Sequence, residues 1–143
     1  MVLSQLNMSN PIPQVQRFMT TSPHSVGLAQ TLAHARQMMK MLQVRHLPVL
    51  EGGKLRGLLA ERDLLLVETL SGVDVRKMTV EEAMIPSVYS VAPDARLDEV
   101  AATMAEHKYG SVVVMQDEKV VGILTTVDVC RALAQVLRAP VIS

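Results

Sequence analysis

The sequence predicts an α/β fold made of two tandem copies of one strand-helix-strand-strand-helix unit. Three observations lead to this prediction. The chain repeats itself at an offset of 65 residues, each copy contains an apolar stripe with the helical period, and each copy contains two short apolar runs separated by a polar turn. The 143 residues, of which 49% are hydrophobic, are enough to bury a core and exclude a disordered chain.

The repeat is visible when the sequence is aligned with itself without gaps. Of the 51 positions from Val15 to Leu65, 12 are identical to the residue 65 positions later, where chance gives roughly three. Gly57 falls on Gly122, and Asp63 falls on Asp128. The chain is therefore a duplication. We expect an N-terminal arm at residues 1–13, the first repeat at 14–71 and the second repeat at 79–138.

In the first copy, a short extended segment at Pro23–Val26 precedes an apolar stripe from Leu28 to Leu42, which predicts a helix. The apolar runs Leu47–Leu50 and Leu55–Leu59 flank a Glu-Gly-Gly-Lys turn and predict a β-hairpin. A second helix is expected at Arg62–Leu70.

The second copy shows the same order. An extended segment at Val88–Val91 precedes a helical stripe that follows the start signal Pro93-Asp94. The runs Val112–Met115 and Val120–Leu124 predict a hairpin, and a final helix is expected at Thr126–Leu137. A unit of about 60 residues is marginally stable alone, so the two sheets are expected to pack about a pseudo-twofold axis that creates two equivalent clefts.

Composition excludes several classes of partner. The 14 basic and 14 acidic residues cancel, and only three residues are aromatic, which argues against a nucleic-acid surface. No apolar run approaches the roughly 18 residues of a membrane span, and the first residues do not resemble a signal peptide. The single cysteine, Cys130, fits a reducing compartment and predicts a cytoplasmic location. We expect its thiol to be buried and structural.

The sequence predicts a protein that is not an enzyme. No serine stands in a nucleophile elbow, and no nucleophile is paired with a base. The four histidines are scattered without metal-ligand spacing, so no metal site is expected. The methionine-rich first helix predicts core filling or a dimer contact, and a metal or redox function through methionines and Cys130 stays an alternative.

Several strings resemble the cystathionine β-synthase (CBS) domain pair, a Bateman-type module. They are Phe18-Met19-Thr20, Ala83-Met84, Arg45–Val49, Gly57–Asp63 and Gly122–Asp128. The last two follow the family's Gly-x-x-[Ser/Thr]-x-x-Asp pattern, except that the first of them has alanine at the hydroxyl position. The resemblance covers the chain from about residue 15 to residue 137.

The resemblance implies a binding site for an adenosine-containing ligand. In that family the motif aspartate binds the ribose hydroxyls and the preceding Ser/Thr contacts phosphate, which suits a carboxylate and a helix N-terminus. Asp128 and Thr125 form one complete set with Thr126 beside them, and this cleft is expected to bind more tightly. Asp63 has Ala60 in place of the hydroxyl. The remaining implied nucleotide-binding residues are Arg62 and His46, which would supply charge, and Ser22, Val26, Val91, Pro48 and Val113, which would line the adenine slot.

The implied function is a non-catalytic regulatory module. ATP, ADP, AMP or S-adenosylmethionine would bind in a cleft between the repeats, with or without Mg²⁺, and a homodimer would signal to an effector protein. The alternative is an oligomerisation or interaction module whose clefts are degenerate. Under that alternative the pair Thr125 and Asp128 is a helix cap, and Asp63 only complements a helix dipole.

Overall fold

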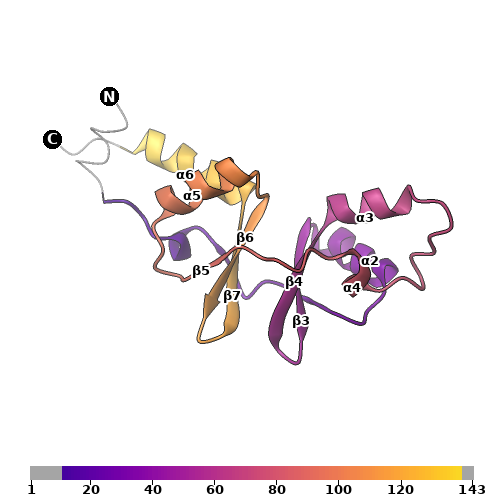
Figure 1. The fold of residues 1–143 in the computed structure, drawn as a ribbon. Coiled ribbons are helices and arrows are strands. Elements are labelled where there is room, and N and C mark those ends of the chain that lie inside the picture. Colours follow the sequence, from indigo (N-terminus) through magenta and orange to yellow (C-terminus); the bar gives the residue numbers. More distant parts are fainter. Residues whose placement is uncertain (1–10, 140–143) are drawn as a thin grey trace. The chain divides into compact units, whose positions relative to one another are not determined.

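The computed structural model describes residues 11–139, which form two compact units (Figure 1). The first unit contains residues 11–21, 90–116 and 121–139, and the second contains residues 22–89 and 117–120. Each unit therefore consists of the body of one repeat together with a segment from elsewhere in the chain. The expected arm at 1–13 lies outside the described residues except for its last three positions, where the Pro13 carbonyl accepts the Leu97 N–H at 3.0 Å.

The described chain follows the predicted order of elements. A 3-10 turn, η1, and six helices and strands of the first repeat are followed by the elements of the second, which has a helix in place of η1 and a single bridge residue, Ile85, in place of the strand β1. Their bounds are η1 Val15–Arg17, β1 Thr20–Thr21, β2 Val26–Gly27, α2 Leu32–Leu42, β3 His46–Glu51, β4 Lys54–Ala60, α3 Glu61–Glu68, α4 Val80–Ala83, β5 Ser90–Val91, α5 Leu97–His107, β6 Ser111–Gln116, β7 Lys119–Thr125 and α6 Thr126–Arg138.

The structure confirms the α/β fold with two tandem repeats. Helices α2 and α5 have the same length and begin 65 residues apart, and so do the hairpins β3–β4 and β6–β7. Both helices end at a residue in the left-handed conformation, Gln43 at φ 55° and Lys108 at φ 58°. The equivalence that the sequence shows therefore extends to backbone conformation.

The first helix of the first repeat begins later than the sequence predicts. Helix α2 begins at Leu32 because the Thr31 hydroxyl accepts the His34 N–H at 3.2 Å and caps it, which leaves Leu28 in the preceding loop. Helix α5 begins at Leu97, after the start signal Pro93-Asp94, as the sequence predicts. Apolar spacing extends the prediction into the loop because Leu28 is buried even though it is not helical.

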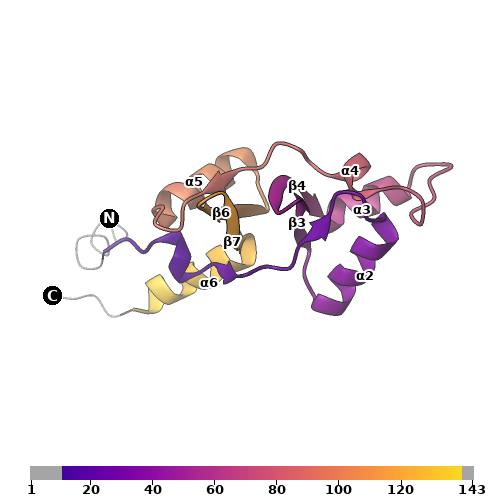
Figure 2. The same cartoon turned by 90° about the horizontal axis from the view of Figure 1, so that it is seen from below.

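Each unit contains one sheet. In the second unit, β2 pairs in parallel with β3, and β3 pairs antiparallel with β4. In the first unit the strand order is β1-β7-β6-β5, with β5 parallel to β6. Figures 1 and 2 show α2 and α3 beside the β3–β4 hairpin, and α5 and α6 beside the β6–β7 hairpin.

The two repeats exchange their first segments. Strand β1, which begins the first repeat, pairs with β7 of the second, so that Thr20 lies opposite Ile123. The equivalent residue of the second repeat, Ile85, pairs with Leu58 of the first repeat through two hydrogen bonds of 2.9 Å. The sequence repeat and the compact unit are therefore different divisions of the chain.

Two glycines allow this exchange. A Cβ on Gly122 would collide with the sulfur of Met19, and a Cβ on Gly57 would lie 2.5 Å from the sulfur of Met84. Both glycines lie in the second hairpin strand of their unit, where a neighbouring segment crosses them closely. Each methionine thus fills the space that a side chain would otherwise take.

The core of each unit is apolar and lies between the helices and the sheet. In the second unit it includes Leu32, Ala35, Met39, Leu47, Val49 and Leu59, with Val80 of the exchanged helix α4 packed among them. In the first unit the fully buried residues include Val15, Val112, Val113, Val114 and Leu124. The exchanged segments therefore contribute to the core.

Candidate functional site

The turn from β7 to α6, Thr125–Asp128, is here called the repeat 2 turn. The Asp128 carboxylate accepts the Thr125 N–H at 2.9 Å and the Thr125 hydroxyl at 3.1 Å, both through Oδ2. In return, the Asp128 N–H donates to the Thr125 hydroxyl at 3.3 Å. This reciprocal cap holds the carboxylate in the first helical turn, where Asp128 is only 5% exposed.

The second carboxylate oxygen of Asp128 is also occupied. Oδ1 accepts a hydrogen bond from Arg131 at 3.1 Å, one turn further along α6. The Arg131 side chain is largely exposed, whereas the Asp128 side chain is almost completely buried. Both carboxylate oxygens therefore have hydrogen-bond partners, and the carboxylate is fixed in position.

The repeat 1 turn, Ala60–Asp63, has half of this cap. Asp63 accepts the Ala60 N–H at 3.0 Å through Oδ2. Ala60 has no side-chain oxygen to receive a hydrogen bond in return, and Asp63 is half-buried. The two aspartates thus lie in equivalent positions, but only the repeat 2 turn offers a hydroxyl.

His46 lies next to the repeat 1 turn. It begins β3 directly opposite Ala60, and the Arg45 carbonyl accepts the Glu61 N–H at 2.8 Å, which joins the start of β3 to the start of α3. Burial lowers the pKa of His46 below its ordinary value. Four charged groups also act on this pKa: the carboxylates of Asp63 and Glu61 raise it, and the guanidiniums of Arg45 and Arg62 lower it.

Comparison with known proteins decides the family. The sequence profile of the CBS domain matches residues 15–68 and 80–135, which are the two repeats. The chain belongs to the CBS domain family. Hypoxic response protein 1 of Mycobacterium tuberculosis is 32% identical to this chain over 111 residues, which cover 77% of this chain and 78% of that protein.

Two similar solved structures contain ligands. The CBS domain pair of protein MJ0100, in complex with 5′-methylthioadenosine and S-adenosyl-L-methionine, has a TM-score of 0.77 and 27% identity, and covers 87% of this chain and 98% of that one. CBSX2 in complex with AMP has a TM-score of 0.77 and 28% identity with the same coverage. Some CBS pairs similar to this chain therefore bind adenosine-containing molecules.

The structure separates the remaining expected residues of the CBS repeats into two groups. Thr126, Arg62 and Ser22 are exposed, and Val91 is half-buried. The other three, Val26, Pro48 and Val113, are buried in the core. A ligand would meet the backbone of these three rather than their side chains. The ligand contacts of all these residues stay predictions.

Three residues beside the two turns were not among the sequence-predicted site residues. Arg131 contacts Asp128 at a spacing of three residues, which is a helix-face neighbour that the sequence pattern could have indicated. Arg45 adjoins the repeat 1 turn through its carbonyl. Ser111 is the second repeat's equivalent of His46; it is 5% exposed, and its hydroxyl has no hydrogen-bond partner among the described residues.

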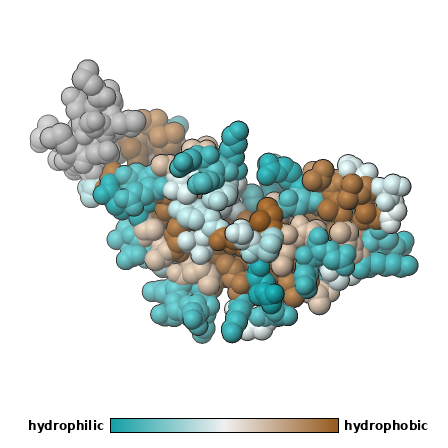
Figure 3. Space-filling view, in the orientation of Figure 1, coloured by the Kyte–Doolittle hydropathy of each residue, from teal (hydrophilic) through white to brown (hydrophobic). Residues whose placement is uncertain are grey.

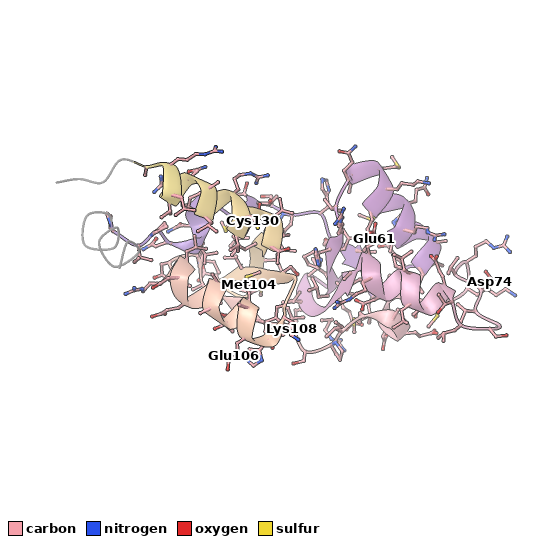
Figure 4. All side chains as sticks on the ribbon, turned by 90° about the horizontal axis from the view of Figure 1, so that it is seen from above. Glu61, Asp74, Met104, Glu106, Lys108 and Cys130 are labelled. Atoms are coloured by element: carbon pink, nitrogen blue, oxygen red, sulfur yellow. The ribbon has the colours of Figure 1, made fainter. Side chains whose placement is uncertain are left out.

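The expected burial of Cys130 is wrong. Its side chain is exposed on α6, as Figure 4 shows. The residue lies on the same helix face as Val127 and Leu137, which are also exposed, whereas Ala132 faces the core. The neighbours of a cysteine in sequence do not indicate which face of the helix it occupies.

A cavity of about 410 Å³ lies in the first unit, beside the end of α6. Its lining contains Pro11, Pro13, Arg17, Gln135, Val136, Arg138 and Ala139, and none of the expected ligand-binding residues. Within residues 11–139, no three His, Cys, Asp or Glu side chains are grouped so that they could hold a metal ion. Across the same residues, no helix is both long enough and apolar enough to cross a membrane.

Proposed function

We propose that this CBS domain pair is a non-catalytic regulatory module that binds an adenosine-containing ligand. The observation that carries the proposal is the Asp128 carboxylate, which the repeat 2 turn holds at a helix N-terminus within a CBS fold. A carboxylate can accept both hydroxyls of a ribose at once. The complexes of MJ0100 and CBSX2 with adenosine-containing molecules support this choice of ligand class.

Regulation would follow from a difference in ligand affinity between two conformations of the module. A ligand shifts such an equilibrium only as far as it binds one state more tightly than the other. We infer that an effector protein responds to this shift.

The ligand can be identified by measuring thermal stability with ATP, ADP, AMP, S-adenosylmethionine and 5′-methylthioadenosine, each with and without Mg²⁺. A ligand present at 100 times its Kd stabilises the fold by about 2.7 kcal/mol. A stabilisation that disappears in Asp128→Asn supports the proposal, because this variant removes the negative charge and retains a carbonyl oxygen for the cap. Asp94→Asn is the matched control, since Asp94 is exposed and lies outside both turns.

A second candidate function is an interaction module with degenerate sites. It is favoured by the full occupation of the Asp128 carboxylate by Thr125 and Arg131. If none of the ligands stabilises the folded protein, this candidate replaces the regulatory one.

We also propose that the chain forms a homodimer through exposed apolar side chains of its helices. The exposed leucines of α3 and its following turn are Leu65, Leu66 and Leu70, and a hydrophobic patch is visible over this helix in Figure 3. Met41 of α2 is 75% exposed. Sedimentation analysis of the protein and of Leu66→Lys tests this proposal; a monomeric natural sequence contradicts it.

A further inference from the structure

The two turns differ at every position that could carry positive charge toward a ligand. Beside Asp63 the first repeat has Arg45, His46 and Arg62. The residues 65 positions later, beside Asp128, are Gly110, Ser111 and Val127. The two sites therefore share one carboxylate and differ in the groups that surround it.

In the first repeat, two guanidiniums are available for an anion. Among residues 11–139, neither Arg45 nor Arg62 takes part in an ion pair, and the charges of both act on the His46 imidazole. The adjoining backbones of β3 and α3 keep the three basic residues together. Guanidinium groups bind phosphate oxygens through paired N–H donors.

Two carboxylates face the same imidazole, those of Asp63 and Glu61. Asp63 is held by the Ala60 N–H, and Glu61 is exposed at the start of α3 (Figure 4). The site as a whole thus has no large excess of positive charge. Phosphate binding would depend on direct contacts with the arginines rather than on the net charge.

In the second repeat, the positions equivalent to the three basic residues offer a phosphate no positive charge. The Thr125 hydroxyl donates its one hydrogen to Asp128 and accepts the Asp128 N–H in return. The guanidinium of Arg131 is already paired with Asp128. What remains are uncharged hydroxyls: that of the exposed Thr126 and that of the buried Ser111, which has no hydrogen-bond partner among the described residues.

We propose that the two repeats select adenosine ligands of different charge. The repeat 1 turn, with Arg45, His46 and Arg62, takes a ligand that carries phosphates, and the repeat 2 turn, with Ser111 and Asp128, takes an adenosine derivative without phosphates. This inference rests on the proposed function and assigns a ligand class to each of its two sites.

The test is calorimetric titration of the full chain with ATP and with 5′-methylthioadenosine. The natural sequence is expected to bind both without competition. The variant Arg45→Gly/Arg62→Val, which gives the first repeat the residues of the second, is expected to lose at least about tenfold in ATP affinity and to keep its affinity for methylthioadenosine. Arg76→Val is the matched control, because Arg76 is highly exposed and lies in the connection between the repeats.

The reverse substitution provides a gain of function. Val127 is 60% exposed, so Val127→Arg leaves the core intact and is expected to allow ATP to bind at the second repeat as well. Competition between the two ligands for one site, or loss of ATP binding in Asp128→Asn with no change in Arg45→Gly/Arg62→Val, overturns the inference while the proposed function stands. Absence of binding by every ligand overturns both.

Discussion

The two glycines beneath the exchanged segments predict unequal responses to alanine. At Gly122, the three atoms nearest to a new Cβ all belong to the flexible side chain of Met19. At Gly57, the new Cβ meets the Met84 sulfur at 2.5 Å and the Ile85 carbonyl oxygen at 2.8 Å. A side chain can rotate away, but a carbonyl in a strand pair cannot.

The magnitudes follow from these contacts. Replacing glycine by alanine in extended backbone stabilises a protein by about 0.4–1 kcal/mol through the unfolded chain. In Gly122→Ala, a strained Met19 rotamer costs about 0.5–1.5 kcal/mol, so the net change in unfolding free energy is close to zero. In Gly57→Ala, the strain also reaches the two hydrogen bonds between Leu58 and Ile85, each contributing about 0.5–1.5 kcal/mol, and the net loss is about 2 kcal/mol.

Urea unfolding of both variants measures this difference. Adding Met19→Ala to Gly122→Ala is expected to remove the clash, whereas adding Met84→Ala to Gly57→Ala leaves the contact with the carbonyl in place. Double-mutant cycles separate the clash from the packing that each methionine itself provides. Equal losses in the two glycine variants, or full recovery of Gly57→Ala by Met84→Ala, would refute the reasoning.

Three further predictions concern the caps, pH and the thiol. Thr125→Ala is expected to cost about 1 kcal/mol of stability, because the hydroxyl completes the helix cap in the repeat 2 turn. Ala60→Thr is expected to add a similar amount, because the repeat 1 turn lacks this hydroxyl. Chemical denaturation of the two variants checks both signs. The pKa of His46 is lowered in the folded protein, so the unfolded chain binds more protons below about pH 6.5. Stability should therefore fall as the pH drops below that value. In His46→Asn, the urea midpoint should change less between pH 7.5 and pH 5.5 than it does in the natural sequence. The exposed Cys130 should react with a thiol reagent at the same rate in native protein as in urea, and a slow reaction in the native state would contradict its placement.

The fold was largely predictable because duplication doubles every local signal. A glycine, an apolar run or a polar turn that is ambiguous alone becomes informative when it recurs 65 residues later. The start of α2 was less predictable, since Leu28 is buried in a loop and continues the apolar spacing of the helix. The exchange of first segments could not be predicted at all. Self-alignment shows that Thr20 and Ile85 are equivalent, but not which hairpin each one joins.

The position of the two motif residues at a helix start was predictable, but their hydrogen bonds were not. The motif places Asp128 and Thr125 at a helix start, which the structure confirms. The contact with Arg131 and the orphan hydroxyl of Ser111 depend on side-chain geometry that spacing alone does not determine. The hydrogen bonds of Asp128 also affect the choice of variant. Asp128→Ala would leave the half-buried Thr125 N–H without its partner, at a cost of up to about 1–3 kcal/mol, so a loss of binding could not be separated from a loss of stability.

The exchanged segments determine how the chain can be divided. A cut in the connection between the repeats yields two fragments of similar length. Each fragment keeps the first segment that pairs with the sheet of the other fragment. Neither fragment can complete its own core. Val15 of the first repeat is buried in the unit that the second repeat mainly forms, and Val80 of the second repeat is buried in the unit that the first repeat mainly forms. Each fragment supplies the segment that the other fragment lacks, so a mixture of the two fragments should recover the fold by complementation.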